Sequence, residues 1–117
     1  MSEQRPSLAR GDIVSIAAAG AYPGKPRPAL VVQSDLFNPT HASVTVCLVT
    51  STLVDAPLFR VGLAPSPRNG LTVPSQVMVD KVASVPRTAI GRVIGQVEPA
   101  TLAEVEQALQ LWLGLGG

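Results

Sequence analysis

The sequence predicts a small, mainly β protein, a compact and partly closed barrel capped by one C-terminal helix. Three observations predict this fold class. The 117 residues include 11 prolines and 10 glycines spread along the chain, and these divide it into many short elements. Between them lie short apolar or alternating runs that are typical of strands. The clearest pattern with helical spacing comes at the end of the chain.

Six of these runs are predicted strands. Residues 28–33 and 43–49 are almost continuously apolar, which is typical of strands buried on both faces. The other four are shorter or less continuous runs, at residues 13–16, 59–63, 75–79 and 91–97. Many short strands of this kind favour a barrel or meander over long helices.

The segments around the strands are predicted to be loops and short turns. Residues 1–9 are expected to form a flexible leader, and residues 17–26 a loop rich in glycine and proline. Residues 34–38 suit one helical turn capped by Ser34. Residues 86–90 suit another short turn of helix.

The C-terminal segment predicts an amphipathic helix. Thr101 and Glu104 have the spacing of a capping box, and Pro99 lies just upstream. An apolar stripe follows at three- and four-residue spacing, made of Leu102, Val105, Leu109 and Trp112. We expect this stripe to pack against the core or a dimer partner.

The composition indicates one domain over residues 1–117 with an aliphatic core. Aromatic residues make up 3% of the chain, so Val, Leu, Ile and Ala must fill the interior. A chain of this length builds a modest core, and dimerisation would help to stabilise it. The net charge of +1 argues against a broad basic surface for nucleic acid, so any phosphate site must use a few local cations.

Other features bear on the cellular compartment. Cys47 is the single cysteine, so an intramolecular disulfide is excluded, and its place in the run VTVCLV predicts a buried thiol. No apolar stretch reaches membrane-spanning length, and the N-terminus lacks the apolar stretch of a signal peptide. We therefore expect a cytoplasmic protein without a membrane partner.

Several kinds of catalytic site are disfavoured by the residues present. A metal site needs clustered ligands, and the one His and one Cys have no ligand neighbours in sequence. His41 lies in the polar loop NPTHAS, where a solvated turn residue is expected rather than a triad base. No glycine-rich phosphate loop precedes a helix. The remaining candidates are polar residues at strand ends: Arg27, Thr50, Ser51, Asp80 and Lys81.

Arg27 stands out among these candidates because of its neighbours. In the stretch KPRPALVVQSD it lies between Pro26 and Pro28, directly before an apolar run. The prolines restrict the backbone around the guanidinium. Taken alone, such a residue is more often a rim charge or the ion-pair partner of a carboxylate such as Asp12 or Asp35. Similarly, the Thr-Ser-Thr cluster that starts at Thr50 usually indicates turn chemistry.

Five segments together resemble the MazF/PemK/Kid family of toxins from type II toxin–antitoxin systems. They are RGDIV, RPALVVQSD with FN following, VTVCLVTS, VMVDKV, and IGRVIGQV ahead of the terminal helix. The resemblance spans residues 10–113 in the family's order and spacing. It implies an SH3-like barrel of the CcdB/MazF type, a homodimer, and a cognate MazE-like antitoxin. It also implies cleavage of single-stranded RNA without metal or cofactor, by the RNA's own 2′-hydroxyl, leaving a 2′,3′-cyclic phosphate and a 5′-hydroxyl.

The resemblance also implies roles for particular residues. The family's catalytic arginine falls on Arg27, and the threonine that some members use falls on Thr50, with Ser51 beside it in support. A guanidinium can hold the non-bridging oxygens of the reacting phosphate with two hydrogen bonds. Asp80 matches an aspartate proposed as a base in some members. However, Met78 stands where those members carry arginine, so a structural role for Asp80 stays open.

Further residues are expected to contact RNA. Lys25 and Lys81 would lie near phosphates, and Tyr22 would stack on a base or pack its loop onto the barrel. Asn38, in the FN pair of the motif, is also assigned to RNA binding. Lys81 replaces a glutamine that is frequent in relatives, so a contact that reads bases there could here go to phosphate.

The sequence leaves two other functions open. CcdB-like toxins share the fold and poison DNA gyrase without cutting nucleic acid, which would need no Arg27–Thr50 pair. A decayed family member would keep the fold and bind its antitoxin without cleaving RNA.

Overall fold

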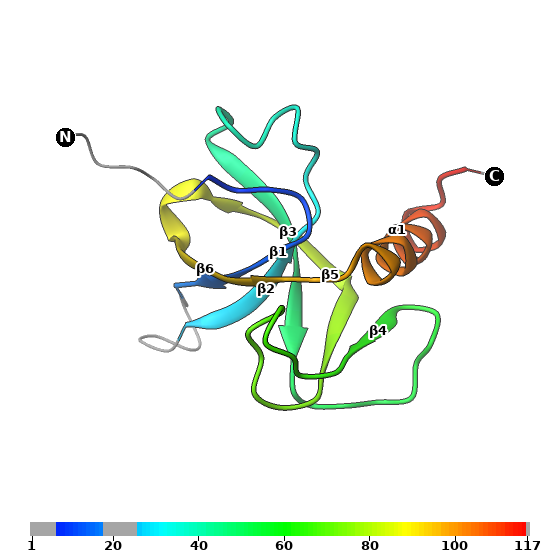
Figure 1. The fold of residues 1–117 in the computed structure, drawn as a ribbon. Coiled ribbons are helices and arrows are strands. Elements are labelled where there is room, and N and C mark those ends of the chain that lie inside the picture. The colour runs from blue at the N-terminus through cyan, green and yellow to red at the C-terminus, as the bar shows by residue number, and fades with distance from the viewer. Residues whose placement is uncertain (1–6, 18–25, 117) are drawn as a thin grey trace.

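The computed structural model describes residues 7–17 and 26–116 and shows a curled antiparallel sheet with one helix beside it (Figure 1). The strand order in the described part is β4-β5-β3-β2-β1-β6. The elements are β1 (Asp12–Ile16), β2 (Arg27–Val31), β3 (Ser43–Thr50), β4 (Arg60–Leu63), β5 (Ser75–Pro86), η1 (Arg87–Ala89), β6 (Ile90–Gln96) and α1 (Pro99–Leu113). The mainly β fold class is thereby confirmed.

The core consists of two apolar clusters on opposite sides of β2 and β3. Leu30 and Cys47 belong to one cluster, while Ala29, Val31 and Val46 belong to the other. All five residues have no exposed surface. This burial confirms the expectation that β2 and β3 are covered on both faces, and it confirms the buried thiol.

The two ends of the sheet meet through the loop after β4. The amide of Gln96 in β6 donates a hydrogen bond of 2.9 Å to the carbonyl of Arg68. Asn69, nearly buried, ties this loop together because its side chain bonds the backbone of Ala64, Ser66 and Leu71. The curled sheet is thus linked end to end by the loop of residues 64–70.

Gly95 is required for this contact between β6 and the loop. A Cβ atom at residue 95 would lie 2.4 Å from the backbone carbon of Asn69 and 2.5 Å from the carbonyl oxygen of Arg68. We predict that Gly95→Ala lowers the free energy of unfolding by about 1–3 kcal/mol, because rigid backbone must shift. Urea denaturation measures the effect. Gly62→Ala is the matched control, since a Cβ there meets no atom of the described residues within 4 Å. Equal stability of the two variants would contradict the prediction.

The N-terminal leader and the helix start differ from the sequence-based expectation. Leu8 is buried against the core and the amide of Ala9 bonds the Asp12 carboxylate at 2.9 Å, so the leader does not extend to residue 9. The helix begins at Pro99 with Glu98 as N-cap and no side-chain cap. Proline is favoured at the first helical position, so the predicted capping box at residues 101–104 lies inside the helix.

Strand β5 is longer than expected because it contains an irregularity. Cys47 of β3 pairs with Val82, whereas the next residue, Leu48, pairs with Met78. Residues 79–81 therefore have no paired residue in the described part of β3, although the Val79 amide donates to the Phe59 carbonyl at 2.9 Å, and the strand continues to Pro86. Asp80 and Lys81 are polar and were expected to follow the end of a strand at residue 79, but they lie at the bulge within β5.

Candidate active site

A pocket of about 390 Å³ lies at the end of β2 and β3 where Arg27 and Thr50 stand. Three segments of the described chain line it: residues 26–28, residues 49–52, and residues 71–73 with Ser75. The first two segments contain the predicted catalytic residues. The third segment was not predicted from the sequence. Its residues LTVPS lack the regular spacing of apolar side chains that indicates a strand or a helix.

The strand register explains why Arg27 and Thr50 share this pocket. Ala29 pairs with Leu48 in the antiparallel β2–β3 ladder. Continuing that register by two residues along each strand brings Arg27 opposite Thr50. Arg27 is exposed and Thr50 is partly buried. The local sequence thus places a guanidinium and a hydroxyl at one rim, although 22 residues separate them in the chain.

The hydroxyl of Thr50 has a defined hydrogen bond. Its Oγ1 accepts the amide proton of Thr52 at 3.0 Å. A threonine hydroxyl has two acceptor lone pairs and one proton to donate. With one lone pair used by the backbone, the group is oriented, and its proton is suited to a bond with a phosphate oxygen in the pocket.

The pocket combines hydroxyl groups with an apolar wall. Ser51, Thr52 and Thr72 are exposed there, and Leu71 and Val73 contribute apolar side chains. Such a surface suits a nucleotide, which presents a polar phosphate and an apolar base face.

Asp80 and Lys81 are not among the described residues that line this pocket. They lie at the bulge of β5, where Oδ1 of Asp80 is buried and has no hydrogen-bond partner within residues 7–17 and 26–116. The pKa of Cys47 is raised to about 12, first by burial and second by the nearby charge of Asp80. Asp80 thus contributes its charge near the core thiol and lies outside the described lining of the pocket.

Asn38 has a different environment from the one expected of an RNA contact. It is 1% exposed, its Nδ2 donates to the Gln33 carbonyl and to Asp35, and its Oδ1 accepts from Gln33. The guanidinium of Arg87 also donates to the Asn38 carbonyl. Asn38 thus organises its own loop, and its burial argues against direct contact with RNA.

The carboxylates suggested as ion-pair partners of Arg27 have other contacts. Asp35 accepts the Arg10 amide proton and an Asn38 amide proton, both at 2.8 Å, and these bonds lower the pKa of Asp35. Asp12 is buried and accepts bonds from Ala9 and Gln96. Tyr22 and Lys25, two predicted RNA contacts, lie outside the described residues.

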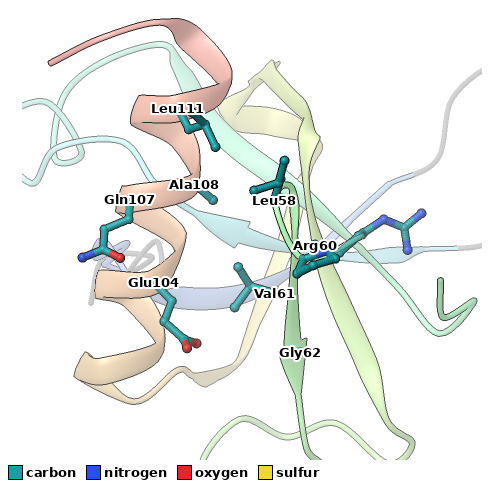
Figure 2. A pocket seen from close by; sticks show the side chains of 9 residues that line it. Leu58, Arg60, Val61, Gly62, Glu104, Gln107, Ala108 and Leu111 are labelled. Carbon is teal, nitrogen blue, oxygen red and sulfur yellow. The ribbon is translucent and has the colours of Figure 1, made fainter. Parts of the chain in front are cut away.

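A second pocket, also of about 390 Å³, lies between β4 and α1 (Figure 2). Leu58 and Leu111 line it and are 67% and 60% exposed. Figure 2 shows Arg60 of β4 extending away from the helix, with its guanidinium outside this groove. The groove therefore combines the apolar side chains of Leu58 and Leu111 with the polar side chains of Glu104 and Gln107 from α1.

Residues 7–17 and 26–116 contain neither a metal-ligand cluster nor a membrane-spanning helix. No three of their His, Cys, Asp and Glu side chains gather as a set of metal ligands. None of the helices in that part of the chain has the length and hydropathy to cross a membrane.

Comparison with known proteins identifies the family. A model of PemK-like, MazF-like toxins of type II toxin–antitoxin systems matches residues 9–113. The chain belongs to this family. It is 44% identical over 110 residues to the probable endoribonuclease MazF of Mycolicibacterium smegmatis, covering 94% of this chain and 100% of that protein. It is 32% identical to endoribonuclease MazF9 of Mycobacterium tuberculosis, with 92% and 98% covered.

Solved MazF structures share the fold. MazF of Deinococcus radiodurans superposes with a TM-score of 0.77 at 29% identity, covering 95% of this chain and 100% of that one. The MazE–MazF complex from the same organism gives 0.78 at 26% identity, with 96% and 100% covered. The protein is therefore a MazF-type toxin and an endoribonuclease. The predicted family and enzyme class are confirmed, and these relatives favour RNA cleavage over gyrase poisoning.

Proposed function

We propose that this MazF-type toxin cleaves single-stranded RNA in the pocket of Arg27 and Thr50, using the RNA's own 2′-hydroxyl as nucleophile. The observation that carries the proposal is the presence of both residues at one pocket, on matching ends of paired strands. The 2′-oxygen forms a bond to the adjacent phosphorus, and the bond from phosphorus to the 5′-oxygen breaks. The 2′-oxygen loses a proton and the 5′-oxygen gains one, leaving a 2′,3′-cyclic phosphate and a 5′-hydroxyl.

Arg27 and Thr50 have distinct roles in this reaction. Negative charge develops on the non-bridging phosphate oxygens in the transition state, and the guanidinium of Arg27 can hold two of them at once. Thr50 donates its hydroxyl proton to a non-bridging oxygen of the same phosphate, which can accept more than one hydrogen bond. Ser51 supplies a further hydroxyl at the same rim. We assign no step to Asp80, since the described pocket lining does not include it.

Lys25 and Tyr22 keep their proposed roles as a phosphate contact and a base-stacking residue. Lys81 is exposed on β5, and we propose that it contacts phosphate along the bound strand. The low net charge of +1 means that few phosphates are neutralised, so RNA affinity should depend modestly on salt.

The proposed partners follow from the family. A mycobacterial endoribonuclease has been solved in complex with its cognate antitoxin, and the Deinococcus MazF with MazE. We propose that a MazE-like antitoxin neutralises this toxin and that the toxin is a homodimer. The exposed apolar surface around Leu58, Leu111 and Trp112 is available for such contacts. The site of action is the cytoplasm, where single-stranded RNA is present.

Incubation of the purified toxin with a long single-stranded RNA tests the function. We expect discrete fragments that carry 2′,3′-cyclic phosphate and 5′-hydroxyl ends, formed equally well in excess EDTA. Intact RNA together with inhibition of DNA gyrase would overturn the proposal in favour of a CcdB-like toxin. Intact RNA with retained binding of the antitoxin would indicate a decayed enzyme.

A further inference from the structure

We propose that Arg60 and Gln76 are positioning residues that hold residues 52–54 and thereby orient the Thr50 hydroxyl for RNA cleavage. This inference rests on the proposed function of the Arg27–Thr50 pocket. We use the name clamp for the side chains of Arg60 and Gln76 together with the backbone groups of Thr52 and Val54 that they bind.

Gln76 holds the segment at two points. It lies in β5 directly opposite Thr50 in the β3–β5 ladder. Its Oε1 accepts the amide proton of Val54 at 3.2 Å, and its Nε2 donates to the Val54 carbonyl at 2.9 Å. Both backbone polar groups of Val54 are therefore bound by one side chain. This matters because residues 51–54 follow the end of β3 and have no strand partner in the part of the chain that the structure describes.

Arg60 completes the clamp from the neighbouring edge strand. Its Nη1 donates to the Thr52 carbonyl at 3.0 Å and to Oε1 of Gln76 at 2.7 Å. Bonds from a charged donor are stronger than those between neutral groups. Arg60 is partly buried, which reduces competition from water. The guanidinium thus fixes both the loop and the side chain that holds it.

Thr52 transmits this restraint to the catalytic hydroxyl. Its carbonyl is bound by Arg60, and its amide donates to Oγ1 of Thr50. The two peptide groups on either side of Thr52 are therefore both held. If the clamp is removed, the Thr52 amide is free to move, and the Thr50 hydroxyl loses the bond that directs its proton. The effect should fall on the chemical step, because the Thr50 contact strengthens as charge develops on the phosphate.

The first test is steady-state cleavage of a short RNA that contains a mapped cleavage site. We expect Gln76→Ala and Arg60→Met each to lower kcat by on the order of tenfold to a hundredfold, with little change in KM. Gln76→Glu keeps the oxygen that accepts from Val54 and Arg60 and should retain more activity than Gln76→Ala. Arg68→Met is the matched control. Nη1 of Arg68 lies 3.7 Å from Oε1 of Glu98, and Arg68 is not among the residues that line the pocket. This variant should cleave RNA at the wild-type rate.

A double-mutant cycle separates this role from a general structural one. If the clamp acts through Thr50, Gln76→Ala should have almost no further effect on kcat in a Thr50→Val background. An equal loss in both backgrounds would overturn the inference. A rise in KM with unchanged kcat for Arg60→Met would also overturn it, and would indicate that Arg60 binds RNA directly.

A measurement without RNA keeps the two proposals distinguishable. Hydrogen exchange followed by NMR should show slow exchange of the Thr52 and Val54 amides in the wild type and fast exchange in Gln76→Ala, with the β3 amides unchanged. Fast exchange of both amides in the wild type would overturn the clamp. Failure of the wild type to cleave any RNA would instead overturn the proposed function, while the exchange rates would still decide whether the clamp exists.

Discussion

Replacing Arg27 by alanine is expected to lower the rate of RNA cleavage by on the order of a hundredfold or more. The guanidinium is the charged group at the pocket that is best suited to stabilise the phosphate in the transition state. Arg27 is exposed at the start of β2, so its truncation opens no cavity in the core. Activity should therefore be lost while the protein remains folded.

Cleavage assays and thermal unfolding together check this expectation. Arg27→Lys should recover part of the activity, because an ammonium keeps the charge but lacks the planar arrangement of two donors. Arg68→Ala removes a different exposed arginine and should leave cleavage unchanged. Expression of Arg27→Ala in cells should no longer inhibit growth. Near wild-type cleavage by a folded Arg27→Ala variant would show that the site is wrongly assigned.

Thr50→Val should have the next largest effect, with kcat lowered by on the order of a hundredfold. Valine has nearly the same shape and is also favoured in strands, so β3 is preserved while the hydroxyl is lost. The Thr52 amide that bonds this hydroxyl lies at an exposed position, where water can replace the lost acceptor.

Thr50→Ser provides the comparison, because it restores a hydroxyl on the same backbone. Its kcat should lie well above that of Thr50→Val, with both variants close to wild type in thermal stability. Ser51→Ala tests whether the neighbouring hydroxyl contributes to the reaction, and it should lower kcat less than Thr50→Val does. If Thr50→Val and wild type cleave the mapped RNA equally fast, the Thr50 hydroxyl has no part in the reaction.

Most of the strands could be predicted from local patterns. The apolar runs that became β2 and β3 are recognisable because strands buried on both faces carry little polar sequence. The longer β5 could not be predicted, since Asp80 and Lys81 are polar residues accommodated by a bulge. The helix start was misplaced because a proline at the first position can begin a helix without a side-chain cap.

The candidate site was only partly predictable. Arg27 and Thr50 were found through the motifs around them, and the register then placed them together. Asn38 belongs to the same motif, but its buried side chain forms hydrogen bonds within its own loop. A sequence motif does not distinguish a residue that holds a loop from one that contacts substrate.

By itself, the sequence determined the fold class, the family, and the two residues proposed for catalysis, because strand patterns and motifs are local properties of the chain. The tertiary structure decided which residues surround Thr50: the wall of residues 71–73, and the side chains of Arg60 and Gln76. These residues reach Thr50 only because β5 pairs with both β3 and β4. The pairing of distant strands depends on how the whole sheet buries its apolar side chains. The local sequence around Arg60, Gln76 and residues 71–73 therefore does not reveal that they lie near Thr50.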